Sequence, residues 1–467
     1  MKPFCLLLSL LLCCLTVVNA QPEKLYGVNL GSWLLIEPWM LPGEWLSMGG
    51  ENCDNCADCI RSEFAFVKAF PDTADQKFAK HWDTWFNQAD VDELVNLRIN
   101  TARIPLGYWI VEPLVDRKNE FYPRGGLKSL RRGLSQLRKA GIEVILDHHA
   151  LPGVQTPNQM FAGRCTSDVE FYTDKNYQRA LTWTAVMTTL SHIDPEFSTV
   201  FAIEAVNEPI MDANMTPGYG QFQKNFVRTI RVVEAILGIY TFDPAVPELH
   251  FDQSDIATAF GKVASDSELQ SKFPEQVLKA VAEAAPIVQE IVHDLVKDDS
   301  TLQFRGNNGG NRKPLVTNFM DINWQKNNPP NPADAAIGPI AFDNHLYYSF
   351  GGVADANEEA YLTSICNLKR VEADAELGNS PLWFGEWGLP TQFDATDEFL
   401  FKWADAQKLA YTKGAGWIFW NFKIEISKEA NDTARQWSYF EGVRRGYLTK
   451  DPAQLHDPKV CEPYIQK

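Results

Sequence analysis

Short apolar runs recur along the chain, and each of them ends in polar, acidic or aromatic residues. The eight runs cover residues 26–33, 100–107, 143–149, 199–209, 314–320, 340–348, 381–388 and 414–423. Most of them lack a strict alternation of apolar and polar positions, which is typical of parallel strands buried on both faces. The pattern therefore predicts eight buried, parallel strands.

Helical patterns lie between these runs, clearest at residues 127–140, 177–191, 221–237 and 396–412. Eight strand–helix units predict an α/β fold, the (β/α)8 TIM barrel. No Ser/Thr/Pro-rich linker, repeat or low-complexity tract divides the chain, so we expect residues 21–467 to form a single domain.

Two segments are longer than a minimal barrel needs. Residues 34–80 form a cysteine-bearing loop after the first strand, and residues 239–313 form a long insertion between the fourth and fifth units. The insertion contains an acidic amphipathic helical pattern from about 266 to 298. Long insertions in a barrel usually modify its active face, although this one could also lie on the outside of the barrel.

Residues 1–20 are typical of a signal peptide. Lys2 precedes a leucine-rich apolar run, which ends at the small-residue sequence Val18-Asn19-Ala20. The run is too short for a membrane-spanning helix, which needs roughly 20 apolar residues, and no later segment is long enough either. We therefore expect a secreted protein, extracellular or in the cell wall, with no membrane partner.

Cysteine usage agrees with export. Three of the nine cysteines lie in residues 1–20, and an even set of six remains: Cys53, Cys56, Cys59, Cys165, Cys366 and Cys461. An even number in an exported chain predicts disulfides of unspecified connectivity. The alternative is a metal site at Cys53, Cys56 and Cys59, but no nearby His or Cys supplies the fourth ligand of a tetrahedral site.

Charge and aromatic content narrow the class of partner. Asp and Glu outnumber Lys and Arg by 60 to 43, which argues against nucleic acids and anionic membranes as partners. The 14 Trp and 14 Tyr residues suit stacking on sugars, although a large aromatic core would need them as well. The acidic balance fits a protein that acts on a neutral polysaccharide, although charge alone does not identify one. We expect the protein to be a monomer.

Polar, acidic and aromatic residues gather where the predicted strands end. In a barrel these ends meet on one rim, where catalytic groups sit. The residues are Glu37, Arg103, His149, Asn207, Glu208, Trp324, His345, Tyr347, Glu386 and Trp420. Each residue alone is more often structural, as we expect for His148 beside His149, but their joint position favours an active site.

Two carboxyl groups on this rim suit glycoside hydrolysis, which needs one acid and one ionised carboxylate flanking the scissile bond. Glu208 follows the fourth predicted strand and Glu386 lies in the seventh. We expect Arg103 and Tyr347 to hydrogen-bond Glu386 and hold its pKa down. An ionised Glu386 would raise the pKa of Glu208, and Asn207 could contact the sugar 2-hydroxyl.

At these residues the sequence resembles glycoside hydrolase family 5. The matching stretches, spread from residue 26 to about 425, are Gly27-Val28-Asn29-Leu30-Gly31-Ser32-Trp33, Arg103-Ile104-Pro105, Asp147-His148-His149, Val206-Asn207-Glu208-Pro209, His345-Leu346-Tyr347, Gly385-Glu386-Trp387 and Gly416-Trp417-Ile418-Phe419-Trp420. Within the family the chain is similar to fungal secreted β-glucanases of the exo-β-1,3-glucanase and β-1,6-glucanase branches.

The resemblance implies a retaining double displacement with no metal and no organic cofactor. It implies that Glu208 is the acid/base and Glu386 the nucleophile. It also implies sugar-binding roles for Glu37, Arg103, His149, Asn207, His345, Tyr347 and Trp420, with Phe161 and Phe350 as walls of an outer subsite. The substrate implied is a neutral, fungal-type cell-wall β-glucan.

Linkage and mode of attack stay open at this stage. Glu37-Pro38-Trp39 and residues 78–82 favour β-1,6-glucan over β-1,3-glucan, whereas Ala150 and the insertion depart from both branches. A mouth ringed by Trp109, Trp324, Trp387, Trp417 and Trp420 would suit a neutral glucan. The alternatives are an endo-β-1,4-glucanase, a β-mannanase, or a non-catalytic carbohydrate-binding protein, which would usually lack one of the two carboxylates.

Overall fold

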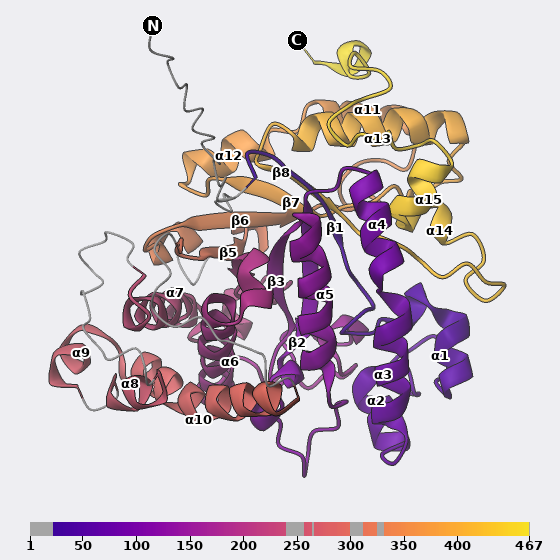
Figure 1. Cartoon of the computed structure of the whole chain (residues 1–467). Coiled ribbons are helices and arrows are strands. Elements are labelled where there is room, and N and C mark those ends of the chain that lie inside the picture. The colour runs from indigo at the N-terminus through magenta and orange to yellow at the C-terminus, as the bar shows by residue number, and fades with distance from the viewer. Residues whose placement is uncertain (1–21, 240–255, 264–265, 299–311, 325–330, 467) are drawn as a thin grey trace, which may run out of the picture.

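Eight parallel strands form a closed barrel in the computed structural model, which describes residues 22–239, 256–263, 266–298, 312–324 and 331–466 (Figure 1). The strands follow one another around the barrel in chain order. They are β1 (Leu25–Asn29), β2 (Thr101–Gly107), β3 (Glu143–Ala150), β4 (Val200–Glu204), β5 (Val316–Met320), β6 (Ile340–His345), β7 (Leu382–Glu386) and β8 (Gly416–Phe419). Each strand overlaps its predicted run, so the predicted fold class is confirmed.

The inside of the barrel is built in layers, because alternate residues of a strand point to the same face. Near the amino ends of the strands an apolar layer closes the barrel, formed by Leu25, Ile145, Ala202, Val316, Ala341, Trp383 and Ile418. Two residues further along their strands lie Asp147, Glu204 and Asp343, which are fully buried together with Arg103 of β2. A buried polar layer therefore lies between the apolar plug and the rim.

Gly385 shows how tightly this polar layer is packed. A Cβ atom at this position would lie 2.0 Å from a carboxylate oxygen of Asp343, so no side chain fits there. The Gly385 N–H instead donates a 2.6 Å hydrogen bond to Asp343, and its carbonyl accepts one of 2.7 Å from the Asn29 amide. The glycine before Glu386 thus lets the polar layer form directly beneath the nucleophile candidate.

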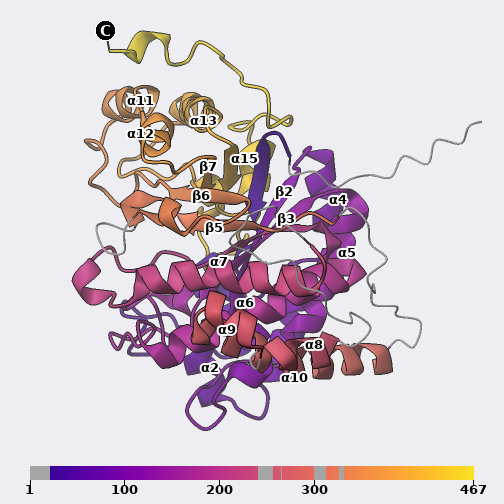
Figure 2. The same ribbon diagram turned by 90° about the vertical axis from the view of Figure 1, so that its left-hand side faces the viewer.

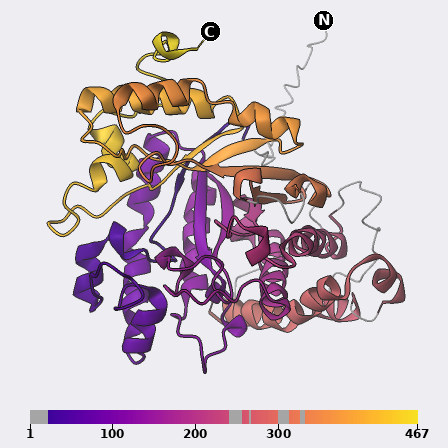
Figure 3. The same cartoon turned by 180° about the vertical axis from the view of Figure 1, so that it is seen from behind.

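Helices cover the outside of the barrel on all sides (Figures 1 and 3). Those nearest the strands are α4 (Gln88–Asn96), α5 (Gly126–Ala140), α6 (Asp174–Ile193), α7 (Tyr219–Ile236), α11 (Glu358–Cys366), α12 (Arg370–Glu376) and α13 (Asp397–Tyr411). The predicted helical patterns fall within or closely match α5, α6, α7 and α13. The first loop carries α1 (Pro42–Met48), α2 (Glu63–Ala69) and α3 (Ala74–Trp85).

The described part of the insertion packs on the outside of the barrel. It forms α8 (Ile256–Val263), α9 (Ser267–Lys272) and α10 (Glu275–Asp298), so the expected acidic helix is broken before Pro274. Glu283 of α10 accepts hydrogen bonds from Gln178 and Thr182 of α6, at 3.1 and 2.9 Å. Figure 2 shows α8, α9 and α10 beyond α6 and α7, on the side away from the strands.

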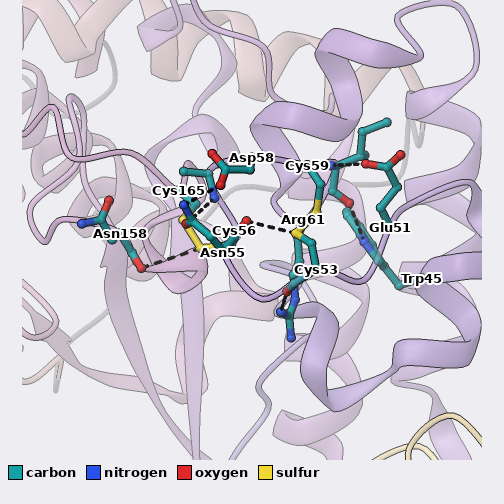
Figure 4. The surroundings of a disulfide bond; sticks show 12 residues. Trp45, Glu51, Cys53, Asn55, Cys56, Asp58, Cys59, Arg61, Asn158 and Cys165 are labelled. Carbon is teal, nitrogen blue, oxygen red and sulfur yellow. Dashed lines mark hydrogen bonds between the residues drawn. A yellow bond between two sulfur atoms is a disulfide. The ribbon is translucent and has the colours of Figure 1, made fainter.

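All six cysteines outside residues 1–20 form disulfides, as predicted. The pairs are Cys53–Cys59, Cys56–Cys165 and Cys366–Cys461. Cys53–Cys59 lies in the first loop, where Trp45, Glu51 and Arg61 surround it, and Cys56–Cys165 joins the same loop to the segment between β3 and α6 (Figure 4). Because the thiols pair with one another, the alternative of a metal site at Cys53, Cys56 and Cys59 is wrong.

The predicted signal peptide, residues 1–20, lies outside the described residues. Among the helices that the structure describes, none is long and apolar enough to cross a membrane.

Candidate active site

Glu208 and Glu386 face each other at the carboxyl end of the barrel. A carboxylate oxygen of Glu208 and one of Glu386 lie within 4.8 Å of each other. Glu386 is the last residue of β7, and Glu208 follows β4 in the left-handed region, with φ of 41°. A left-handed conformation at a residue with a side chain is strained and is common at functional sites. The Thr156 hydroxyl holds it by donating a hydrogen bond to the Glu208 carbonyl.

Arg103 lies beneath Glu386 with every donor group engaged. Its Nη1 donates to Glu386 Oε1 and to Asn29 Oδ1, both at 3.0 Å. Its Nη2 donates to Asn207 at 2.8 Å and lies 3.1 Å from Asp147, and its Nε donates to Glu204 at 2.9 Å. Only a guanidinium has five donors in a fixed plane that can satisfy such a set. The expected contact between Arg103 and Glu386 is therefore present.

The position of Arg103 differs from the prediction. Arg103 is the third of seven residues in β2 and pairs with Asn29 and Ile145, so it lies inside the barrel and not at the strand end. The expectation failed because the position of a side chain along the barrel axis depends on strand register, which an isolated strand sequence does not give.

His345 and Tyr347 bind the two carboxyl groups from β6 and the loop after it. His345 Nδ1 lies 2.8 Å from Glu208 Oε1 and 3.5 Å from Glu386 Oε2. The Tyr347 hydroxyl donates a 2.9 Å hydrogen bond to Glu386 Oε2. Each oxygen of Glu386 thus has a donor, Arg103 for one and Tyr347 for the other.

His149, Asn207 and Trp420 line the site next to this pair. The imidazole of His149 stacks on Trp420, with ring centroids 5.6 Å apart and 10° between the planes. Its Nδ1 lies 2.5 Å from Asp147, which fixes the ring, and its Nε2 lies 3.5 Å from the Asn207 amide. Phe161 meets His149 edge-on at 5.6 Å. The structure therefore brings these predicted residues together.

Glu37 joins the same group from the first loop and is buried. The indole N–H of Trp39 donates a 2.9 Å hydrogen bond to Glu37 Oε2. Burial, together with the charges of Glu386 and Glu208, outweighs this hydrogen bond and raises the pKa of Glu37 to about 8. In neutral solution Glu37 is therefore largely a carboxylic acid, which can both donate and accept hydrogen bonds.

The buried polar layer retains protons. If Asp147, Glu204, Glu208, Asp343 and Glu386 were all ionised, they would outnumber the positive charges of Arg103 and a protonated His345. Burial accordingly raises the pKa of Glu204 to about 8 and that of Asp147 to about 7. Burial alone would lower the pKa of His345, but the charge of Glu386, the hydrogen bond to Glu208 and the nearby carboxylate of Asp343 raise it well above its usual value.

The pKa of Glu386 corrects a second expectation. Burial raises it to about 8, although the charges of His345 and Arg103 both oppose the rise. Arg103 thus acts in the expected direction, but desolvation is the larger effect. The sequence argument considered only the charged neighbour and left burial out.

Two groups of metal-ligating residue types occur here, and both contain His345. One is Glu204, Asp343 and His345, and the other is Glu208, His345 and Glu386. Glu386 already accepts hydrogen bonds on both oxygens, and His345 Nδ1 already faces Glu208. In the group of Glu208, His345 and Glu386, a metal ion would have to displace these contacts, so this group suits proton transfer better than metal binding.

Three of the five tryptophans expected at the mouth are elsewhere. Trp387 and Trp417 are fully buried in the layer between barrel and helices, 5.3 Å apart. Trp109 is buried and stacks on Tyr122 at 4.0 Å. Of these five tryptophans, only Trp324 and Trp420 contact residues of the site. The ring centroid of Trp324 lies 5.8 Å from that of His345, and Trp420 stacks on His149. His148, as expected, is a core residue, stacked on Trp183 at 3.9 Å.

Four aromatic residues form a wall of the site, which we call the aromatic wall: Trp39, Tyr347, Phe350 and Trp437. Tyr347 and Phe350 were expected at the site, whereas sequence reasoning missed Trp437. Trp437, at the end of α14 (Ala434–Trp437), lies 5.1 Å from Trp39, 5.5 Å from Tyr347 and 6.3 Å from Phe350, measured between ring centroids. Phe350 is 76% exposed, so the wall reaches from the buried carboxyl pair to solvent. Trp437 lies far beyond the last predicted strand, and no strand-end signal marks it. Sequence reasoning also missed the buried carboxyl groups of Glu204 and Asp343. Alternate residues of a strand point into the barrel, so an acidic residue at an inward position is a usable signal.

Comparisons with known proteins agree with this geometry. No family model matches the chain. "Glucan endo-1,6-beta-glucosidase B" of Emericella nidulans is 29% identical over 450 residues, which cover 94% of this chain and 88% of that protein. "Glucan 1,3-beta-glucosidase" of Blumeria graminis is 33% identical over 191 residues, 40% of this chain and 41% of that protein. The crystal structure of rutinosidase from Aspergillus niger has the same fold, with a TM-score of 0.58, 16% identity and coverage of 91% of this chain and 97% of that one.

Proposed function

We propose that this chain is a retaining glycoside hydrolase of family 5, which cleaves β-glucosidic bonds in a neutral β-glucan by double displacement. The enzyme class itself, an O-glycosyl hydrolase, follows from curated relatives that span nearly the whole chain and are glucan β-glucosidases. The observation that carries the retaining mechanism is the approach of Glu208 and Glu386 to within 4.8 Å. Retaining enzymes separate their carboxyl groups by about 5–5.5 Å, and inverting enzymes by roughly 6.5–9.5 Å.

The roles of the two carboxyl groups follow from their surroundings. Glu386, with Arg103 and Tyr347 on its oxygens, is the nucleophile that attacks the anomeric carbon. Glu208, more exposed and next to His345, protonates the glycosidic oxygen as the bond to the anomeric carbon breaks. Glu208 then takes a proton from water, whose oxygen displaces Glu386 and releases the sugar with its original anomeric configuration.

The positive charge that develops on the sugar ring favours an ionised Glu386. Burial raises the pKa of Glu386, and this desolvation makes its carboxylate a stronger partner for a cationic transition state. Arg103 and Tyr347 stabilise the same carboxylate when it leaves in the second step. We assign sugar-binding roles to Glu37, His149, Asn207, His345 and Trp420, which surround the pair.

We propose β-1,6-glucan as the preferred substrate. The relative named for endo-1,6 activity aligns over nearly the whole chain, whereas the one named for 1,3 activity aligns over less than half of it. The motif Glu37-Pro38-Trp39 also lies inside the site, where Trp39 fixes Glu37. A second candidate, β-1,3-glucan, keeps the same mechanism.

We also propose that the enzyme is secreted as a monomer, with residues 21–467 as one catalytic domain. Three disulfides support export, because such bonds persist in oxidising compartments. The chain also has two N-glycosylation motifs, Asn214-Met215-Thr216 and Asn431-Asp432-Thr433, and both asparagines are exposed. The N-terminal sequence of the protein recovered from the culture medium tests cleavage after Ala20.

Azide rescue tests the two catalytic roles. Glu386→Gln should abolish turnover of both glucan and 2,4-dinitrophenyl β-glucoside. Glu208→Ala should still form the glycosyl-enzyme from the dinitrophenyl substrate, because that leaving group needs no proton, and azide should then restore turnover as β-glucosyl azide. The assignment is wrong if azide rescues neither variant or rescues Glu386→Gln with the same product.

A substrate panel tests the linkage. Pustulan, laminarin, carboxymethylcellulose and galactomannan are incubated with the enzyme, and early products are separated by size. Activity on pustulan with β-anomeric products, read by proton NMR, is the expected result. Activity on laminarin alone would contradict the linkage and keep the mechanism, and activity on mannan or carboxymethylcellulose alone would contradict the β-glucan assignment. An α-anomer as first product would contradict retention.

A further inference from the structure

Glu37 is held in the site by its backbone as well as by its side chain. The hydroxyl of Ser32 accepts a 2.9 Å hydrogen bond from the Glu37 N–H and donates one of 3.0 Å to the Glu37 carbonyl. Trp39 holds carboxyl oxygen Oε2, which leaves Oε1 without a partner among the described residues and available to a ligand. Ser32 thus sets where the free oxygen of Glu37 lies.

Ser32 itself adopts a conformation that its own side chain does not favour. Its φ is 56°, in the left-handed region, where a residue with a side chain is uncommon and needs support from its surroundings. The support comes from α3, since His81 Nε2 lies 2.6 Å from the Ser32 carbonyl. A carbonyl oxygen only accepts, so His81 Nε2 donates.

The other nitrogen of His81 is also engaged. Nδ1 lies 3.0 Å from Glu44 Oε1, and the hydrogen bond with His81 holds the pKa of Glu44 below its usual value despite partial burial. Glu44 thus fixes the imidazole ring of His81 at its second nitrogen. His81 is fully buried, and its ring stacks on Trp85 at 5.7 Å with 28° between the planes.

Two further hydrogen bonds join α3 to the same loop. The indole of Trp85 donates to the Gly31 carbonyl at 3.1 Å, and the indole of Trp33 donates to the Trp82 carbonyl at 2.9 Å. Residues 78–82 and the Glu37-Pro38-Trp39 motif, which lie more than 35 residues apart, are therefore one physical unit. None of the contacts described for His81 involves Glu208 or Glu386.

We infer that His81 is a positioning residue, which acts through Ser32 to place the carboxyl group of Glu37 against the sugar. The inference rests on the proposed function, in which Glu37 binds substrate. Displacement of Glu37 by about 1 Å would lower kcat/KM by tenfold to a hundredfold, the usual effect of such a shift in an active site.

Two conservative variants separate the two hydrogen bonds of His81. The amide nitrogen of Gln occupies roughly the place of Nε2, so His81→Gln keeps the bond to Ser32. The amide nitrogen of Asn occupies that of Nδ1, so His81→Asn loses it. Activity should fall in the order wild type, His81→Gln, His81→Asn. The matched control is His192→Gln, because His192 is also buried and pairs with a buried carboxylate, Glu234, at 3.2 Å, but lies before the amino end of β4.

A double-mutant cycle tests whether His81 acts through Glu37. The values of kcat/KM and KM are measured for His81→Asn, Glu37→Gln and the double variant, on 4-nitrophenyl β-glucoside and on the polymer that the wild type cleaves best. The double variant should be within about twofold of Glu37→Gln alone, because residues that act as a unit are not additive. Losses that multiply, or a His81→Asn enzyme equal to His192→Gln, would overturn the inference.

Ser32→Ala gives the same test without a change in α3. The substitution removes both hydrogen bonds to the Glu37 backbone. The decrease in kcat/KM that Ser32→Ala causes should likewise vanish when Glu37 is already replaced by Gln. Thermal unfolding of each variant shows whether it is folded. If His81→Asn is not folded, the double-mutant cycle is measured with Ser32→Ala and Glu37→Gln instead. A wild type inactive on every β-glucan would instead overturn the proposed function, and the cycle is then measured on the glycoside it does cleave.

Discussion

Arg103 and Glu386, 283 positions apart in the sequence, are joined by a 3.0 Å hydrogen bond inside the barrel. The same guanidinium also binds Glu204, Asn29 and Asn207. The position of the proposed nucleophile is therefore set by a residue whose other donors are all fixed by the barrel interior. Such preorganisation is where we expect much of the catalytic effect to arise.

We expect Arg103→Lys to lose at least about a hundredfold in kcat, because an ammonium cannot reproduce five donors in one plane. The acidic limb of the pH–rate profile should also move upward, since Arg103 lowers the pKa of Glu386 against the larger effect of burial. Initial rates between pH 3 and pH 9 on an aryl β-glucoside measure both effects.

Arg231→Lys is the matched control for this substitution. Arg231 is equally buried and binds Glu234 and the Leu315 and Pro339 carbonyls, which precede β5 and β6 at the opposite end of the barrel. Its replacement should lower stability and leave the pH profile in place. If Arg103→Lys and Arg231→Lys have the same profile, Arg103 has only a structural role.

Strand order and the residues of the site could be predicted because both follow from local patterns. Buried parallel strands are continuous apolar runs, and their carboxyl ends meet on one rim, which placed Glu208, His149, His345 and Glu386 together. The depth of Arg103 could not be predicted, since it depends on the stagger between neighbouring strands.

The misplaced tryptophans could have been recognised from the period of a strand. Glu386 points into the barrel, so its neighbour Trp387 must point to the helix layer. Ile418 belongs to the apolar plug, so Trp417 must also point outward. Trp437 is different, because its place beside Tyr347 depends on how the chain folds back after β8, and no local pattern encodes that.

The aromatic wall predicts a substrate-dependent effect of Trp437. Trp437→Ala should lose about tenfold in kcat/KM on a long β-glucan, the equivalent of about 1.4 kcal/mol of stacking and apolar contact. The loss on 4-nitrophenyl β-glucoside should be much smaller, because that substrate has no second sugar to stack on the wall. Trp437→Phe should retain most of the polymer activity.

Leu377→Ala controls for the removal of an exposed apolar side chain. Leu377 is 50% exposed and lies after α12, before the amino end of β7, on the face away from the site. Leu377→Ala should change neither the activity on the long β-glucan nor the activity on 4-nitrophenyl β-glucoside. Equal losses on polymer and aryl glucoside for Trp437→Ala would mean that Trp437 supports Tyr347 and does not bind an additional sugar.

The three disulfides should differ in their contribution to stability. In the chain-entropy model a loop of about 100 residues gives about 4.7 kcal/mol and a loop of six gives roughly 2 kcal/mol. Cys366–Cys461 closes 95 residues and Cys53–Cys59 closes 6. We therefore expect paired Cys→Ala replacement of Cys366 and Cys461 to lower the free energy of unfolding about twice as much as that of Cys53 and Cys59. Equal losses in urea unfolding would contradict the model for this fold.

Glu63 predicts how stability depends on pH independently of catalysis. This carboxyl group is fully buried in α2 and accepts a 2.7 Å hydrogen bond from the Ile36 N–H. Burial outweighs that hydrogen bond and raises the pKa of Glu63 from 4.5 to about 8. The folded protein therefore binds a proton that the unfolded chain releases between these values.

The sign of the effect follows from proton linkage. Because the folded state holds more protons between pH 4.5 and about 8, the stabilisation from Glu63 is complete below pH 4.5 and is lost as the pH rises through about 8. Its total size is on the order of a few kcal/mol, since one pKa unit corresponds to about 1.4 kcal/mol. Glu63→Gln keeps the acceptor for Ile36 and cannot ionise, so its free energy of unfolding should fall less between pH 5 and pH 8 than that of the wild type. Glu398→Gln, at an exposed helical position paired with Lys402, should follow the wild-type curve. A Glu63→Gln curve parallel to the wild type would show that Glu63 ionises as readily in the folded protein as in the unfolded chain.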